Sequence, residues 1–235
     1  MRPIDPDHLM DFENIFGRLR NLADPEVIAG MARFGIATHQ ALGISLPALR
    51  KIAREIGKDH RLALQLWESG IHEARILAGL VEDANLVTEE QMEQWVSDFD
   101  SWDLCDQCCN NLFIRIPLSD QKAKEWTIRG EEFTKRAGFV LIACLAVHDK
   151  KASDNFFRDF FPLIIAGSSD QRNLVKKAVN WALRQIGKRN QELNRYAIET
   201  AMKILKNESS VTRWIGRDAL RELQSPSVQK RLADH

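Results

Sequence analysis

Apolar residues recur along most of this chain at the three- and four-residue spacing of an amphipathic helix. No stretch shows the sustained alternation of apolar and polar residues that marks a half-buried strand. The pattern therefore predicts an all-α protein. The expected helices cover residues 8–21, 25–34, 47–56, 61–68, 72–81, 89–99, 102–115, 120–127, 131–147, 153–166, 171–186, 191–205 and 211–223.

The predicted helices are of modest length and follow one another through short turns, which favours stacked hairpins over a four-helix bundle. Segments that begin at His72, Lys135 and Val175 share a polar start, a small residue and an aliphatic run. They recur at a spacing near the about 40–47 residues of HEAT-like repeats. We expect a single domain over residues 1–235, an α-solenoid of stacked HEAT-like helical hairpins whose concave face suits a long ligand.

Charge is balanced over the whole chain but not along it. Lys and Arg number 33, as do Asp and Glu, so net charge alone indicates no partner. Between Gln171 and Arg231, however, 14 basic residues stand against 5 acidic ones, which leaves 19 against 28 elsewhere. Such a basic region can face phosphates, although basic helix faces are also commonly just solvated. Charge alone leaves both interpretations open.

The first residues form no apolar core of signal-peptide length, and no later apolar run approaches the about 20 residues of a membrane span. We therefore expect no membrane association and a cytoplasmic location. Three of the four cysteines lie close together in one predicted helix, which is poor geometry for a disulfide framework. Cys105 and Cys108 form a CxxC without a second ligand pair, so the sequence predicts buried, reduced thiols and no metal site.

The run from Ser101 to Asp106 carries the most informative chemistry. Trp102 and Asp106 are four residues apart, which places an indole and a carboxylate on one helical face. This combination suits a cationic guest. Asp103 has a structural interpretation, because an acid in the first turn interacts favourably with the helix dipole. The structural alternative for Asp106 is a salt bridge to an arginine of a neighbouring repeat.

A second tryptophan, Trp181, lies in a predicted helix with cations on either side, Lys176, Lys177 and Arg184. Such interleaving can stack a base while the charges hold phosphates, but Trp181 could equally pack in the core. Arg136 opens a long apolar helix, from which it could pair with a phosphate or hold an acid such as Asp106 in place.

Four of the six histidines, at positions 39, 60, 72 and 148, show no spacing that indicates a metal site or a proton relay. We therefore expect them at the surface or with their hydrogen bonds satisfied.

Taken jointly, these features resemble the DNA alkylation-repair glycosylases of AlkD type, which are built from HEAT-like helical repeats. The resemblance covers roughly residues 31–190 and rests on four places in the chain. These are Met31-Ala-Arg-Phe followed by Leu42-Gly-Ile, Trp102-Asp103-Leu104-Cys105-Asp106 as the Trp-Asp-x-x-Asp signature, Lys135-Arg136-Ala137, and the helix from Lys177 to Arg184 that contains Trp181.

The resemblance implies a monofunctional glycosylase that excises cationic N3- or N7-alkylated purines from double-stranded DNA. It implies Asp106 as the catalytic carboxylate and Trp102 and Trp181 as aromatic walls, with the lesion held in the duplex. Phe34 stands where the family can place a tyrosine. The expected enzyme is monomeric, needs neither metal nor organic cofactor, and is nucleoid-associated if bacterial. The expected DNA-binding residues are Arg136, Phe34, Lys176, Lys177, Arg184, Lys188 and Arg189.

This chemistry needs few catalytic groups, because a cationic base leaves as a neutral molecule and requires no general acid. One fixed carboxylate can stabilise the positive charge that develops on the sugar. Two other functions stay open at this stage. The chain could be a noncatalytic helical-repeat protein that binds damaged or branched DNA, or a scaffold for protein interactions.

Overall fold

The computed structural model describes residues 11–206 and 209–234 of this chain, and this part consists of helices and connecting turns without a strand. The all-α prediction is confirmed. The predicted first helix begins at residue 8, which lies outside the described residues, and its described portion is α1 (Phe12–Asn21). In the described ranges no helix has the length and apolar character needed to cross a membrane.

The chain forms two compact units, and each contains two separate stretches of sequence. One unit comprises Met1–Met92 and Asp100–Leu112, and the other comprises Glu93–Phe99 and Phe113–His235. The single-domain organisation stays a prediction.

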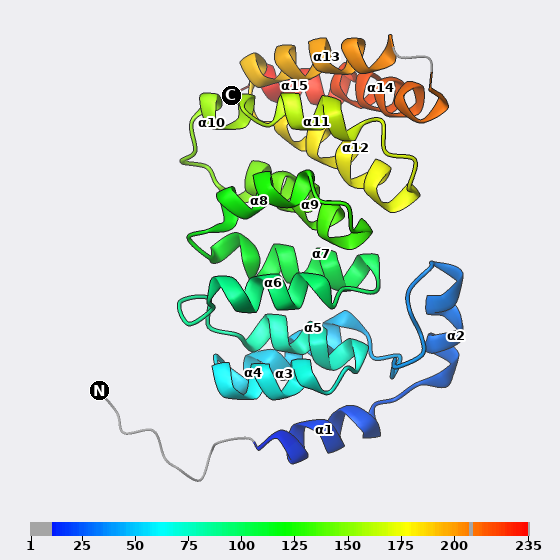
Figure 1. The fold of residues 1–235 in the computed structure, drawn as a ribbon, viewed down its shortest axis with the longest axis vertical. Helices are drawn as coiled ribbons and strands as arrows, with labels where there is room; N and C mark the ends of the chain where they lie inside the picture. Colours follow the sequence, from blue (N-terminus) through cyan, green and yellow to red (C-terminus); the bar gives the residue numbers. More distant parts are fainter. Residues whose placement is uncertain (1–10, 207–208, 235) are drawn as a thin grey trace. The chain divides into compact units, whose positions relative to one another are not determined.

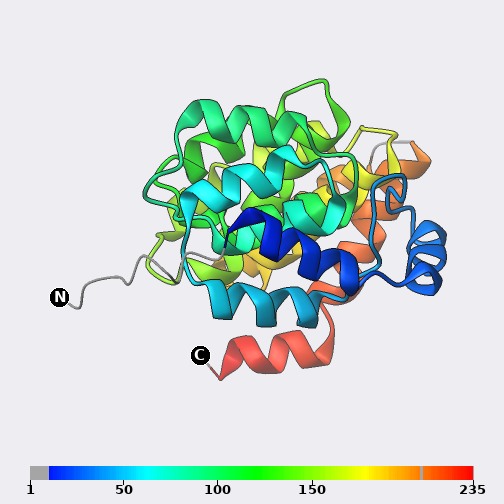
Figure 2. The same cartoon turned by 90° about the horizontal axis from the view of Figure 1, so that it is seen from below.

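The first unit is organised around α5 (His72–Val81), which packs against α3, α4 and α7. Its core-facing residues include Ala74, Leu77, Ala78 and Val81, each with no exposed surface. In Figures 1 and 2, α2 stands at the edge of this unit, and none of its residues is buried. The other helices are α2 (Pro25–Arg33), α3 (Leu46–Ile56), α4 (His60–Glu68) and α7 (Trp102–Asn111), while α6 (Glu89–Ser97) contributes residues to both units.

The second unit is a series of helical hairpins in which α8 packs on α9, α9 on α12, α12 on α14, and α14 on α13 (Figure 1). The helix α9 is the most buried, with an apolar run from Ala137 to Ala146. Gly138 lets α8 approach closely, because a Cβ at this position would lie 2.6 Å from Thr127 N. The elements are η2 (Phe113–Arg115), α8 (Ser119–Thr127), α9 (Glu132–His148), α10 (Asp154–Arg158), α11 (Phe161–Gly167), α12 (Asn173–Gly187), α13 (Gln191–Leu205), α14 (Ser210–Leu223) and α15 (Pro226–Ala233).

Two predicted helices differ from the structure by more than one or two end residues, and one helix was not predicted. The single helix expected over residues 153–166 is divided into α10 and α11, because Pro162 has no N–H to continue the first helix and instead occupies the first turn of the second. The helix expected over residues 102–115 ends at Asn111, and a separate 3-10 turn follows. The pattern also missed α15, whose start is signalled by Ser225 and Pro226, with the Ser225 hydroxyl accepting from Val228 N.

All four cysteines are buried as thiols, as predicted. Burial raises the pKa of Cys108 well above its ordinary value, so this thiol stays protonated and unreactive near neutral pH. The CxxC is therefore part of the core-facing side of α7.

Candidate functional site

The helix α7 separates its buried face from a polar, half-exposed face. Leu104, Cys105, Cys108 and Cys109 face the core of the first unit. The signature residues Trp102, Asp103 and Asp106 are each partly exposed. Trp102 and Asp106 therefore share one side of the helix at its surface, as their spacing predicts.

The orientation of Trp102 is fixed by a contact with the α2 segment. Its indole Nε1 donates a hydrogen bond to the carbonyl oxygen of Phe34, 3.0 Å away. Phe34 follows α2 directly and is 73% exposed. The contact leaves the Phe34 ring at the surface. Phe34 is one of the residues predicted to contact DNA.

Asp103, the first acid of the signature, is held by two side chains of the protein. Asp103 Oδ2 lies 2.9 Å from Nε2 of the buried His72, and its Oδ1 accepts from the Ser101 hydroxyl at 2.8 Å. Burial alone would raise the pKa of Asp103, but the hydrogen bond and charge of His72 outweigh burial and lower it. Asp103 therefore has the structural role that one interpretation gave it, through His72 and not through the helix dipole alone.

The residue after His72 fixes the loop that precedes α3. The buried carboxylate of Glu73 accepts from Leu42 N and Gly43 N, each at 2.7 Å, and from Ile44 N at 3.3 Å. Gly43 has a φ of +77°, and a Cβ there would lie 2.3 Å from Asp24 O. The Leu-Gly-Ile segment is thus bound by Glu73. The sequence reasoning assigned no function to Glu73 and missed the His72 contact, since the partners lie far apart in the chain.

The helix α12 carries Trp181 half-buried within the second unit. With the Gln185 amide oriented so that its oxygen faces the ring, Trp181 Nε1 donates to that oxygen at 2.9 Å. Both predicted aromatic walls therefore have an anchored indole N–H and a partly exposed ring. Trp102 and Asp106 belong to the first unit, and Trp181 belongs to the second.

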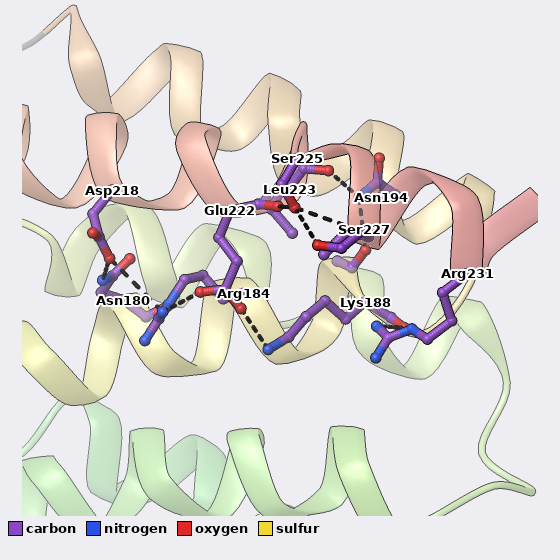
Figure 3. Close-up of polar contacts among 12 residues, drawn as sticks. Asn180, Arg184, Lys188, Asn194, Asp218, Glu222, Leu223, Ser225, Ser227 and Arg231 are labelled. Atoms are coloured by element: carbon purple, nitrogen blue, oxygen red, sulfur yellow. Dashed lines mark hydrogen bonds and ion pairs between the residues drawn. The ribbon is translucent and has the colours of Figure 1, made fainter.

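Several predicted DNA contacts instead hold α12 to its neighbours. Figure 3 shows a polar ladder along α12 and α14 in which Arg184 pairs with Glu222 and Lys188 Nζ lies 2.6 Å from the same carboxylate. One turn earlier, Asn180 donates to Asp218 at 2.6 Å. Burial would raise the pKa of Glu222, but Lys188 and Arg184 outweigh it and lower the pKa. Arg184 and Lys188 are thus already paired within the protein.

The side chains of Arg136 and Arg189 also bind other parts of the protein. Arg136 is 5% exposed and donates to the carbonyl of Leu174 at 2.6 Å, so it joins α9 to α12 within the protein. Its position does not fit the predicted contact with the DNA backbone, because a buried guanidinium cannot reach a phosphate. Arg189 packs over the Phe157 ring at 4.0 Å and donates to the Ala146 carbonyl at 2.7 Å. Burial lowers its pKa.

Two of the cations predicted to bind DNA are accessible to solvent. The neighbouring helix α14 carries further exposed cations. Lys177 is exposed, and the ammonium of Lys176 lies 4.8 Å from the centre of the Trp214 ring. The arginines of α14 belong to the basic region between Gln171 and Arg231, but they were not among the predicted DNA-binding residues. Their four-residue spacing was the available signal. They are Arg213, Arg217 and Arg221.

The titratable side chains of the described ranges include no group of His, Cys, Asp and Glu arranged to hold a metal ion. The candidate residues of the first unit are thus Trp102 and Asp106 on α7, and those of the second unit are Trp181 on α12 and the exposed cations.

Comparison with known proteins identifies relatives of the whole fold. Residues 15–223 match a protein-family model described as DNA alkylation repair enzyme. One solved structure has 20% identity and a TM-score of 0.77, and the match covers 95% of this chain and 96% of that one. It is described as a new family of proteins related to the HEAT-like repeat DNA glycosylases with affinity for branched DNA structures. An engineered protein is similar at 12% identity and a TM-score of 0.44, over 92% of this chain and 96% of that one. No curated protein matches the sequence.

Proposed function

We propose a DNA glycosylase activity for this chain, which belongs to the DNA alkylation repair enzyme family. The proposed substrates are cationic N3- or N7-alkylated purines in duplex DNA, and the bond hydrolysed is the N-glycosidic bond. The observation that carries the proposal is that Trp102 and Asp106 lie together on one half-exposed face of α7.

The proposed reaction needs a single carboxylate, and we assign that role to Asp106. As the bond between the base and C1′ of deoxyribose lengthens, its electron pair stays with the base, which leaves as a neutral molecule. Positive charge develops on the sugar, and the Asp106 carboxylate stabilises it. Water then adds to C1′ and loses a proton, and the same carboxylate orients that water. No carboxylic acid is needed for the leaving group, in contrast to hydrolysis between two sugars.

The indoles of Trp102, in the first unit, and Trp181, in the second, are the groups proposed to favour a charged lesion. An indole face attracts a cation by about 0.5–2 kcal/mol, depending on how far water is excluded. A neutral base gains no such interaction. Because Trp102 donates to Phe34 O and Trp181 to Gln185, the polar edges of both rings are occupied, and the faces remain for recognition.

Incubation of the protein with methylated duplex DNA, followed by chromatography of the released bases, tests the proposal directly. We expect release of alkylated purines by the parent protein, and loss of release with retained DNA binding in Asp106→Asn. Asp103→Asn is the matched control on the same turn, and it should lower the melting temperature. Release of methylated base by Asp106→Asn at the parental rate would remove Asp106 from the mechanism.

The second candidate function is noncatalytic binding of damaged or branched DNA. It is favoured by the fold similarity to a protein described as having affinity for branched DNA structures. This function needs the exposed cations but makes Asp106 dispensable. Salt-dependent DNA binding by the parent without release of any base would select it.

A further inference from the structure

The exposed side of α14 carries a row of arginines beside an accessible indole. Arg213, Arg217 and Arg221 recur every four residues, so they form one ridge of the helix with about 6 Å of rise between neighbours. All three are exposed. Within the described residues no ion pair holds Arg213 or Arg217, so their charge is available to a ligand.

A parallel ridge of α14 places Trp214 beside this row. Trp214 is 39% exposed, which is unusual for the largest apolar residue type in a chain that buries Trp67, Trp95 and Trp126 almost completely. The Lys176 ammonium lies 4.8 Å from the ring centre, so α12 adds another cation to the same place.

The two ridges enclose a shallow pocket of about 390 Å³, lined by Ser210, Arg213, Trp214, Arg217, Asp218 and Arg221. Asp218 is the one acid of this lining. It already accepts from Asn180 and pairs with Arg221, and its side chain is 15% exposed. The pocket is therefore positively charged on its open side, with an aromatic wall.

We propose that this α14 pocket binds an unpaired stretch of DNA, with a base stacked on Trp214 and the arginine row paired with the phosphates. Aromatic side chains within a basic groove are the general means by which proteins hold single strands without reading their sequence. A fully paired duplex keeps its bases stacked inside and offers phosphates only. The indole is therefore what distinguishes an unpaired partner from an intact duplex. The choice of DNA as the polymer rests on the proposed function.

Binding measurements on unmethylated DNA test this inference separately from excision. Fluorescence anisotropy would compare a blunt duplex, the same duplex with a single-stranded overhang, and a fully paired four-way junction. We expect the parent to bind the overhang duplex more tightly than the blunt duplex. Trp214→Ala should weaken overhang binding about fivefold to 150-fold, the range expected for loss of one base stack. It should leave blunt-duplex binding unchanged.

Matched variants separate stacking from charge and from general damage. Trp214→Phe should restore most of the overhang preference. Arg217→Ala should weaken binding to every DNA and reduce its salt dependence. Tyr196→Ala removes an aromatic ring that also lies under arginines, Arg158 and Arg195, but on α13, and should change neither quantity. Circular dichroism would establish that each variant is folded.

Three results would overturn the inference. The first is equal affinity of the parent for blunt and overhang duplexes. The second is unchanged overhang binding by folded Trp214→Ala. The third is displacement of the overhang duplex by poly-glutamate as readily as by an oligonucleotide of equal charge, which would mark an acidic-peptide surface. None of these results bears on base release, so the glycosylase proposal can fail or hold independently.

Discussion

His72 Nε2 lies 2.9 Å from Asp103 Oδ2, and this contact joins the first turn of α5 to the first turn of α7. The backbone N–H of His72 donates to Gln40 O at 2.9 Å, and Glu73 holds the loop at residues 42–44. One dipeptide thus positions both the start of the signature helix and the loop ahead of α3. The half-exposed Trp102 and Asp106 rest on this buried polar connection.

Removal of the imidazole should destabilise the first unit. His72→Ala leaves the half-buried Asp103 carboxylate without its main donor, and an unpaired buried group typically costs about 1–3 kcal/mol. His72→Gln retains an N–H near the position of Nε2 and should cost less. Chemical denaturation of the parent and both variants would measure the free energies of unfolding. Equal stability of the parent and His72→Ala would show that the contact contributes nothing net.

The same pair predicts a pH dependence of stability. Burial lowers the pKa of His72, but Asp103, with Glu73 and Asp100 nearby, outweighs burial and raises it above the ordinary 6.5. The stabilisation is therefore fully present below pH 6.5 and is lost as pH rises through the higher folded value. The pKa of Asp103 is lowered from 3.8, so its contribution is present above pH 3.8 and is lost as pH falls through the lower folded value.

We therefore expect the difference in unfolding free energy between the parent and His72→Gln to be greatest between pH 3.8 and 6.5 and to shrink at alkaline pH. Denaturant titrations from this range into alkaline pH would measure the difference. The buried Nδ1 has no hydrogen-bond partner within the described residues, so the neutral ring can keep its proton on Nε2 and retain the contact. The difference should shrink without reaching zero. A difference that grows with pH would contradict this account.

Gly43 should tolerate no side chain. Gly43→Ala places a Cβ 2.3 Å from Asp24 O in a backbone of positive φ, so it should cost more than the about 1–2 kcal/mol of the left-handed conformation alone. Gly35 is the matched control, because its φ is +71° but nothing lies within 4 Å of its Cβ position. Thermal unfolding of Gly43→Ala and Gly35→Ala would compare them, and an equal loss in both would show that the loop yields at Asp24.

Local patterns predicted most helices of this fold. The periodicity gave the bounds of α5 and α13 as the structure has them, and the Asn190 side chain caps the start of α13 by accepting from Leu193 N. It failed at residues 153–166, where a proline inside an apolar run restarts the helix. The four-residue spacing of Trp102 and Asp106 placed both on one half-exposed face, because helical geometry alone determines that relationship.

The sequence pattern could not predict contacts between residues that lie far apart in the chain. The contact of His72 with Asp103 spans 31 positions, and that of Arg184 with Glu222 spans 38. A basic residue on a helix looks the same in sequence whether it faces solvent or a carboxylate on the next helix. The predicted phosphate contacts Arg136, Arg184 and Lys188 therefore proved to be internal partners, whereas the exposed arginines of α14 were not singled out.

In the ladder between α12 and α14, Glu222 is the counterion of two cations that were predicted to bind DNA, Arg184 and Lys188. Glu222→Gln removes the charge that Arg184 and Lys188 neutralise, so both cations become available to phosphates. We expect tighter DNA binding at low salt and a salt dependence steeper by about 1 to 2 in log–log slope, since each added phosphate contact contributes about 0.9.

Glu199→Gln is the matched control, because Glu199 lies 3.8 Å from Arg195 on α13 and its loss changes net charge equally. Salt titrations of DNA binding would measure both slopes. If the two variants behave alike, the effect is one of net charge, and Arg184 and Lys188 are only structural.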